Sequence, residues 1–419
     1  MIGSILSRIR RASDLIPKLF RLSGGMASQI LSSVTNFGLT ISLARNGSAS
    51  EFGAAALALT FYTSTQLLMA AAINQPLTLL YHAEDQDNRR LLIDKALSLA
   101  IFLSVLCGCC VGLISLFPVG EIVHEYLIIL APALPLLLLL EWQRQMYFTE
   151  IKPYGAFSLD AAWFLGFLSM LTIFQISGRS SSIAAFEAWE ITGVIVAVAG
   201  LIIRRSVPKF AHVWTYFRHS VTVSKNFVGE ALITNLSNPV TVSVVTAKVG
   251  LAPMGGYRGA QTIMSPITIL NSGLLVFVFP KMASLGTKES QKFRKYLNSY
   301  WAATIVLTAV LSCSTFVIPD RFGILILGDS WRETQQLLPM FAVFNVARSF
   351  VAGPQLRLML PRPSIFFVAA RAQDSCLLMV MTISGAYLAG VNGAVWGMAL
   401  SRLLAFPGWY YLAGLRSTI

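Results

Sequence analysis

The chain of 419 residues is too apolar for a protein surrounded by water, since 55% of its residues are hydrophobic and only 12% are charged. Soluble proteins carry about 25% charged residues, so the composition argues against a soluble enzyme and predicts a protein embedded in the lipid bilayer. The net charge of +13 could indicate a nucleic-acid-binding protein. However, the basic residues recur in alternate polar segments between apolar runs, and we therefore expect no nucleic-acid partner.

Residues 1–22 precede the first apolar run and read as a cytoplasmic interfacial segment. Ile2, Ile5, Leu6 and Ile9 share one helical face, opposite serines and arginines, as in helices that lie on an anionic membrane surface. A signal peptide is the alternative, because it also combines a basic start with an apolar run. This apolar run is too long and lacks a clear small-residue cleavage site, so we expect no cleavage.

Twelve apolar runs follow, each long enough to cross a bilayer. A hydrocarbon core of about 30 Å requires about 20 helical residues, because each backbone amide must be paired within the segment. The predicted spans are 24–44, 54–74, 96–117, 122–140, 157–176, 183–203, 227–247, 259–279, 300–318, 335–352, 371–389 and 393–412. The expected fold is therefore an all-α integral membrane protein with about twelve transmembrane helices.

Lysines and arginines in the loops predict the orientation, because positively charged loops stay in the cytoplasm. With these spans, 24 of the 32 basic residues lie on one side and 6 on the other. This bias places both termini in the cytoplasm and favours an even number of spans.

The longest polar stretch, 204–226, divides the chain into two halves. We predict an N-terminal six-helix bundle at 23–203, a cytoplasmic linker at 204–226 and a C-terminal six-helix bundle at 227–419. An offset of 203 residues aligns Ala44, Arg45, Gly47, Ala49 and Gly53 with Ala247, Lys248, Gly250, Ala252 and Gly256. Six spans per half would give repeats of equal orientation, related by an axis along the membrane normal.

Ionisable residues inside the spans are candidates for function, because each costs at least about 2.5–3.5 kcal/mol in hydrocarbon. Arg348 and Arg402 are the deepest cations, and Arg258 lies at the mouth of the eighth span. A guanidinium can hold a phosphate through two parallel hydrogen bonds; an internal ion pair or snorkelling to the interface is the alternative. Glu230 and Asp160 are candidates for ion coupling, with solvation at a helix end as the alternative.

Polar uncharged residues recur in matching spans of the two halves. They could line a sugar-binding cavity or join neighbouring helices. The candidates are Gln29, Asn36, Gln66, Asn235 and Gln261. The cysteines and histidines lack the spacing of metal ligands, and the sequence contains no phosphate-binding nucleotide loop, so we expect no catalytic centre, metal or cofactor.

Three segments carry a resemblance to a known family. They are GGMASQILSSVTNFGLTISLARNGSASEFGAAALALT at 24–60, VTAKVGLAPMGGYRGAQTIMSPITILNSGLLVFVFPKMASL at 245–285 and LGDSWRETQQLLPMFAVFN at 327–345. Together with the twelve-span layout, they resemble the polysaccharide-transporter branch of the multidrug, oligosaccharidyl-lipid and polysaccharide (MOP) exporter superfamily.

The resemblance implies two six-helix bundles around a central cavity that opens alternately to each side of the membrane. Members of the branch move undecaprenyl-diphosphate-linked glycans across the bacterial inner membrane for the assembly of O-antigen, capsule or exopolysaccharide. It also implies polysaccharide polymerase and assembly proteins as partners.

The leading hypothesis is therefore a secondary transporter, a flippase for a lipid-linked oligosaccharide. An ion-coupled multidrug exporter of the same superfamily is one alternative, although the embedded cations would repel cationic drugs. A polytopic enzyme of envelope glycolipids is another, although its chemistry generally needs a large outer loop or an acid–base cluster. A scaffold for a polysaccharide assembly complex is the third.

Overall fold

The computed structural model describes residues 27–117, 120–284, 291–359 and 365–415, and within these ranges the chain forms helices and no strand. The prediction of an all-α fold is confirmed. The predicted interfacial segment at 1–22 lies outside the described residues.

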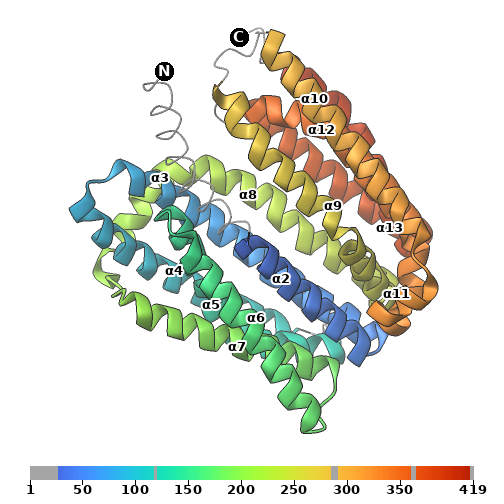
Figure 1. Cartoon of the computed structure of the whole chain (residues 1–419), viewed down its shortest axis with the longest axis horizontal. Coiled ribbons are helices and arrows are strands. Elements are labelled where there is room, and N and C mark those ends of the chain that lie inside the picture. The colour runs from blue at the N-terminus through green and yellow to red at the C-terminus, as the bar shows by residue number, and fades with distance from the viewer. Residues whose placement is uncertain (1–26, 118–119, 285–290, 360–364, 416–419) are drawn as a thin grey trace, which may run out of the picture. The chain divides into compact units, whose positions relative to one another are not determined.

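Figure 1 shows the helices of the described residues, coloured in chain order from blue to red. After a helix at 27–46 come α2 (Ala49–Met69), π-helical η1 (Ala70–Asn74), α3 (Gln75–Ala83), α4 (Gln86–Ser115), α5 (Glu121–Thr149), α6 (Pro153–Ile176) and α7 (Ser182–Arg204). The chain continues through η2 (Phe210–His212), α8 (Val213–Val249), α9 (Leu251–Ser284), α10 (Gln291–Ser314), η3 (Thr315–Val317), α11 (Asp320–Leu327), η4 (Gly328–Ser330), α12 (Trp331–Met359) and α13 (Ile365–Leu415).

Eight helical segments of the described chain are long and apolar enough to cross a membrane. They are Ala49–Thr78, Gln86–Ser115, Glu121–Thr149, Pro153–Ile176, Ser182–Arg204, Gln291–Val317, Asp320–Met359 and Ile365–Gly414. Nine of the twelve predicted spans lie within these segments or extend past them by at most two residues, and the last segment accounts for two of the nine. The other three predicted spans fall on the helix at 27–46, on α8 and on α9.

The 51-residue α13 accommodates two predicted spans because it is a helical hairpin. A straight helix of that length would extend about 77 Å, more than twice the hydrocarbon core. Ala389 and Gly390 leave the helical conformation, and Gly390 has a φ of 62°, which glycine adopts without a steric penalty. A Cβ at Gly385 would overlap the carbonyl oxygen of Gly393. The two arms therefore pack backbone against backbone, as small residues allow between helices in lipid.

Contacts divide the chain into two compact units, which we name by number. Unit 1 comprises Met1–Leu43 and Thr65–Val228, and unit 2 comprises Ala44–Ser64 and Gly229–Ile419. The helix at 27–46 and α2 each begin in one unit and end in the other. The predicted bundle boundaries at 203 and 227 remain a prediction.

Unit 1 is organised around α5, which packs against α4, α6 and α7. Its four leucines at 137–140 are buried, as are Trp142 on the same helix and Trp189 on α7. The indole nitrogen of Trp163 donates to the carbonyl oxygen of Trp189 at 3.0 Å, which fixes α6 against α7. These large buried side chains place α5 so that its polar end lies inside the unit.

Unit 2 is organised around α12, which packs against α9, α10 and α13. Glycines allow these helices to approach closely, because a Cβ at Gly353 of α12 would overlap the ring of Trp301 on α10. The first turns of α2 and α9 also cross at contact distance: a Cβ at Gly53 would overlap the carbonyl oxygen of Leu251, and one at Gly255 would approach that of Ala49. Residues 44–64 thereby become part of the packing of unit 2.

Candidate functional site

Unit 2 contains a pocket of about 220 Å³ between α9, α10 and α12. We call it the polar pocket. Its lining residues are Ile267, Thr268, Asn271, Tyr300, Thr304, Thr308, Asn345, Arg348, Ser349, Ala352 and Gln355. Nine of these eleven side chains carry a hydroxyl, an amide or a guanidinium. In helices that are otherwise apolar, this concentration of polar groups identifies the polar pocket as the candidate functional site.

Helical periodicity explains why these polar residues meet. Residues three, four and seven positions apart lie on one face of a helix. On α12, Asn345, Arg348 and Ser349 follow this spacing, and Gln355 extends the same face by two turns. On α10, the polar residues at 300, 304 and 308 are spaced by four. Each helix therefore turns one polar stripe towards the pocket.

Arg348 is the cation of the polar pocket. Its side chain is solvent-accessible, and it forms no hydrogen bond or ion pair with any residue that the structure describes. Arg371, Arg402 and Asp374 are close enough to interact with it electrostatically. The three cations Arg348, Arg371 and Arg402 outnumber the carboxylate of Asp374. The region therefore carries positive charge that an anionic ligand could neutralise.

The amide and hydroxyl groups of the pocket leave mainly acceptor atoms for a ligand. Asn271 donates through Nδ2 to the hydroxyl of Thr308 at 2.9 Å, and its Oδ1 has no hydrogen-bond partner among the described residues. Asn345 donates to the carbonyl oxygen of Phe341 at 3.0 Å. Free amide oxygens can accept from the hydroxyl groups of a sugar.

Arg402, the other deep cation of the sequence analysis, is engaged inside unit 2. It forms an ion pair with Asp374, and its guanidinium lies 5.8 Å from the ring centre of Phe344. The side chain of Asp374 is 7% exposed and that of Arg402 14%. The internal ion pair named above as the alternative thus describes Arg402 and not Arg348.

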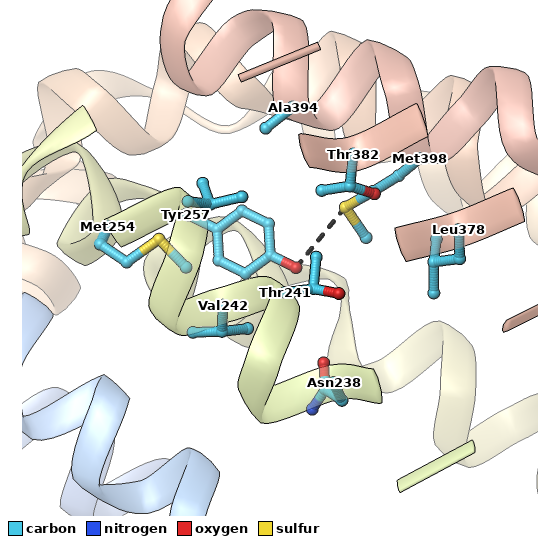
Figure 2. A pocket seen from close by; sticks show the side chains of 10 residues that line it. Asn238, Thr241, Val242, Met254, Tyr257, Leu378, Thr382, Ala394 and Met398 are labelled. Carbon is cyan, nitrogen blue, oxygen red and sulfur yellow. Dashed lines mark hydrogen bonds between the residues drawn. The ribbon is translucent and has the colours of Figure 1, made fainter. Parts of the chain in front are cut away.

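Arg258 and Gln261 belong to a separate hydrogen-bonded chain on α9. Arg258 donates to Gln261 Oε1 at 3.4 Å, and Gln261 donates to the hydroxyl of Tyr257 at 3.0 Å. The Tyr257 hydroxyl in turn lies 3.5 Å from the sulfur of Met398, in a small pocket between α8, α9 and α13 (Figure 2). This pocket has a volume of about 30 Å³, which is room for one or two water molecules but not for a sugar ring.

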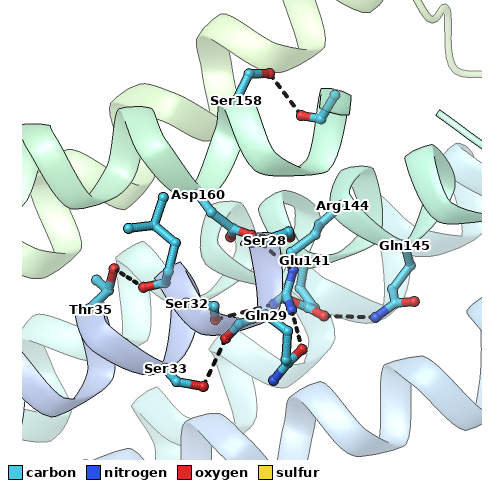
Figure 3. A network of polar contacts seen from close by, with 12 residues as sticks. Ser28, Gln29, Ser32, Ser33, Thr35, Glu141, Arg144, Gln145, Ser158 and Asp160 are labelled. Carbon is cyan, nitrogen blue, oxygen red and sulfur yellow. Dashed lines mark hydrogen bonds and ion pairs between the residues drawn. The ribbon is translucent and has the colours of Figure 1, made fainter. Parts of the chain in front are cut away.

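Unit 1 contains a network of charged residues centred on Arg144 of α5 (Figure 3). The guanidinium contacts Glu141 at 3.0 Å and Asp160 at 3.4 Å, and it donates to the side-chain oxygen of Gln29 at 3.0 Å. The Ser28 hydroxyl donates to Asp160. One cation therefore faces two carboxylates, and the network carries an excess negative charge.

The remaining predicted site residues are Asn36, Gln66, Glu230 and Asn235. Asn36 and Gln66 are in unit 1, and neither forms a side-chain hydrogen bond with a described residue. The side chains of Glu230 and Asn235 on α8 lie outside the described residues. Within unit 2, the polar pocket therefore contains Arg348 but not Arg402, Arg258 or Gln261.

Comparison with known proteins gives the family and the fold. The sequence model of the family described as "Polysaccharide biosynthesis protein" matches residues 42–336. No curated protein matches the chain.

Among solved structures, an inward-facing multidrug resistance MATE family transporter of the MOP superfamily is similar with a TM-score of 0.68, at 12% identity over 94% of this chain and 98% of the other. The lipid II flippase MurJ in an inward closed conformation is similar with a TM-score of 0.70, at 13% identity over 92% of this chain and 86% of the other. A MATE in complex with MaL6 has a TM-score of 0.58, at 13% identity over 96% of each chain.

These identities are low enough that the solved structures establish the fold alone. The structural similarity confirms the predicted membrane-transporter fold. The family match covers well over half of the chain. The chain therefore belongs to the family described as "Polysaccharide biosynthesis protein".

Proposed function

We propose that this protein is a flippase, a secondary transporter that moves a lipid-linked oligosaccharide across the bacterial inner membrane by alternating access. The observation that carries the proposal is the polar pocket, in which Arg348 pairs with no described residue and lies among amide and hydroxyl groups. Such a ligand has a glycan and a diphosphate that need a polar path, and a lipid tail that can remain in the bilayer.

Arg348 supplies the contact to the diphosphate in this proposal. A guanidinium stays charged when it is partly removed from water, and its planar donors match two phosphate oxygens. The amide oxygens of the pocket would accept from the glycan hydroxyls. Binding at Arg348 would neutralise charge in a region where Arg371 and Arg402 also contribute.

Ion coupling is assigned in this proposal to the network around Arg144. Because one guanidinium faces Glu141 and Asp160, a proton on either carboxylate would neutralise the network. Glu230 is retained as the second candidate for coupling, on the sequence alone.

The same proposal places the protein in the inner membrane with both termini in the cytoplasm, on the distribution of lysine and arginine. Its cargo would be an undecaprenyl-diphosphate-linked repeat unit for O-antigen or exopolysaccharide, and polymerase and assembly proteins would be its partners. It would act as a transporter and not as an enzyme.

Transport in proteoliposomes with a fluorescent lipid-linked oligosaccharide tests the proposal. We expect Arg348→Gln to reduce the transport rate about tenfold or more, because a hydrogen bond to a charged group contributes about 1.5–3 kcal/mol, and Arg348→Lys to retain part of the rate. Arg332→Gln is the matched control, because Arg332 lies exposed in the first turn of the same helix.

Equal rates for Arg348→Gln and Arg332→Gln would reject the role of Arg348. No transport of lipid-linked glycan by the unaltered protein, combined with export of cationic dyes, would reject the flippase and favour the multidrug exporter. A deletion strain should retain the lipid-linked sugar on the cytoplasmic face of the membrane.

A further inference from the structure

A second large pocket lies in unit 1, where α3, α5 and α7 end and α4 and α6 begin. Its volume is about 450 Å³, and we call it the basic pocket. Four of its lining residues are cations, namely Arg89, Arg90, Lys152 and Arg204, and two are carboxylates. The walls therefore carry an excess of two positive charges.

The two carboxylates already have partners. Glu150 accepts from Arg204 at 2.6 Å and from Lys152 at 3.2 Å, and Asp94 accepts from the backbone amide of Val207 at 3.3 Å. They hold the pocket walls together and do not cancel the cations completely.

Several cationic donors remain available to a ligand. Arg90 is exposed and forms no hydrogen bond or ion pair with a described residue. The Nε of Arg204 is buried without a hydrogen-bond partner in the described part of the chain. Lys152 has a side chain that is 69% exposed. These donors come from three different helix ends and converge on one pocket.

Aromatic rings orient two of the guanidinium groups. The guanidinium of Arg204 lies 4.7 Å from the ring centre of Tyr147, and that of Arg89 lies 4.9 Å from the ring centre of Tyr81. Stacking of this kind restricts a guanidinium to one plane, so the two cations are held in position before a ligand arrives.

The backbone beside the basic pocket is strained at two positions. In the described chain, the non-glycine residues with positive φ are Ile151, at 59°, and Arg205, at 51°. Ile151 lies between the lining residues Glu150 and Lys152, and Arg205 follows Arg204. Left-handed conformations of non-glycine residues concentrate at ligand-binding sites, and here both such residues flank one pocket.

We propose that the basic pocket binds a phosphate-bearing group, either the headgroup of an anionic phospholipid or a soluble phosphate compound. The helix ends that form it lie on the side that the basic residues predict to be cytoplasmic, where anionic lipids attract clustered lysine and arginine. The pocket is formed entirely by unit 1, so the inference does not rest on the proposed function of the polar pocket in unit 2.

Native mass spectrometry of the full chain in neutral detergent tests this inference. The probes are dioleoylphosphatidylglycerol, dioleoylphosphatidylcholine as the zwitterionic reference, and inorganic pyrophosphate. We expect Arg90→Gln to weaken binding of the anionic probe about fivefold, and Arg90→Gln/Lys152→Gln to weaken it further. Lys209→Gln is the matched control, because Lys209 is exposed near the same helix end and does not line the pocket.

The probes separate the two sources of phosphate. Binding of phosphatidylglycerol but not of pyrophosphate, sensitive to Arg90→Gln, assigns the pocket to a lipid headgroup, and the reverse pattern assigns it to a soluble compound. Because Arg90 has no described partner, its replacement should leave the melting temperature unchanged. If the unaltered protein, the Arg90→Gln variant and the Lys209→Gln control all bind each anionic probe equally well, the inference is overturned.

Discussion

Arg402 and Asp374 show how strongly a charged residue inside an apolar unit depends on its partner. The pair is largely buried, so both charges have lost much of their contact with water. The attraction between them offsets this desolvation only while both are present. Arg348 lacks such a partner in the described chain, and it is the residue that faces the polar pocket.

We therefore expect Asp374→Asn to lower the free energy of unfolding by about 3–5 kcal/mol, because it leaves Arg402 charged and unpaired. The double variant Asp374→Asn/Arg402→Gln should recover much of this loss, since it removes the remaining charge. Thermal melting of the purified variants in detergent provides the measurement. If Asp374→Asn is as stable as the unaltered protein, the charge of Arg402 is solvated by water and does not need Asp374.

Asp160 provides a second test at the level of single residues. Asp160→Asn removes the excess negative charge around Arg144 and leaves Glu141 as its partner. We expect the variant to fold, and we expect its transport to lose most of its dependence on an imposed proton gradient. Transport in proteoliposomes with and without the gradient provides the measurement.

Glu187→Gln is the matched control for Asp160→Asn. Glu187 pairs with Arg179 at 2.7 Å, where the two side chains are 25% and 56% exposed, and such surface pairs contribute about 0–1 kcal/mol. Unchanged gradient dependence in Asp160→Asn would remove this carboxylate from the coupling mechanism.

The helical elements extend well beyond the spans that hydropathy predicts. The fourth predicted span ends at residue 140, whereas α5 continues to Thr149. Hydropathy measures the apolar length of a helix, and the helix itself continues as long as its backbone amides are paired. Glu141 and Arg144 lie in this extension, so hydropathy places them in a loop, and of the network it predicts only Gln29 and Asp160 as candidates.

The bend in α13 and the polar residues of α10 could be predicted, because each depends on a pattern within one stretch of the sequence. The gap at 390–392 between the last two predicted spans coincides with the bend at Ala389 and Gly390. The polar stripe on α10 was also visible in the spacing of residues 300, 304 and 308, but threonines and a tyrosine occur in many apolar helices. Only the meeting of polar residues from α9, α10 and α12 distinguishes the polar pocket, and that requires the tertiary structure.

The close contact between the arms of α13 leads to a prediction for this element. Gly385→Ala should lower the free energy of unfolding by about 1–3 kcal/mol, because its Cβ would overlap the backbone of Gly393. Gly112→Ala is the control, since its Cβ would lie 3.6 Å from the Cβ of Ala131, at ordinary contact distance. Equal melting temperatures for the two variants would mean that the arms of α13 separate at low cost.

At the scale of the whole molecule, apolar length predicts the twelve spans, and the distribution of charge predicts their orientation, which stays a prediction. Neither signal reports which helices pack together. The assignment of 44–64 to unit 2 depends on glycines at 53 and 255, which allow a close crossing between segments about 200 residues apart. No sequence pattern within either segment indicates its partner.

Labelling of single cysteines tests the predicted orientation of the whole chain. In a background without the five native cysteines, a membrane-impermeant maleimide should label Ser180→Cys in intact spheroplasts. It should label Lys209→Cys only after the membrane is opened. Both positions are exposed and follow one another across a single helix, α7. Labelling of Lys209→Cys in intact spheroplasts would reverse the topology.

The passage of residues 44–64 into unit 2 has a consequence for how the molecule is made. A ribosome completes this segment long before it synthesises α9, with which the segment packs in unit 2. Cleavage of the chain at 204–226 would therefore yield no self-sufficient halves, because the second fragment would lack a helix that only the first encodes. The segment 44–64 is therefore made before its packing partner α9 exists, and unit 2 can complete its packing only when the amino-terminal part of the chain is present.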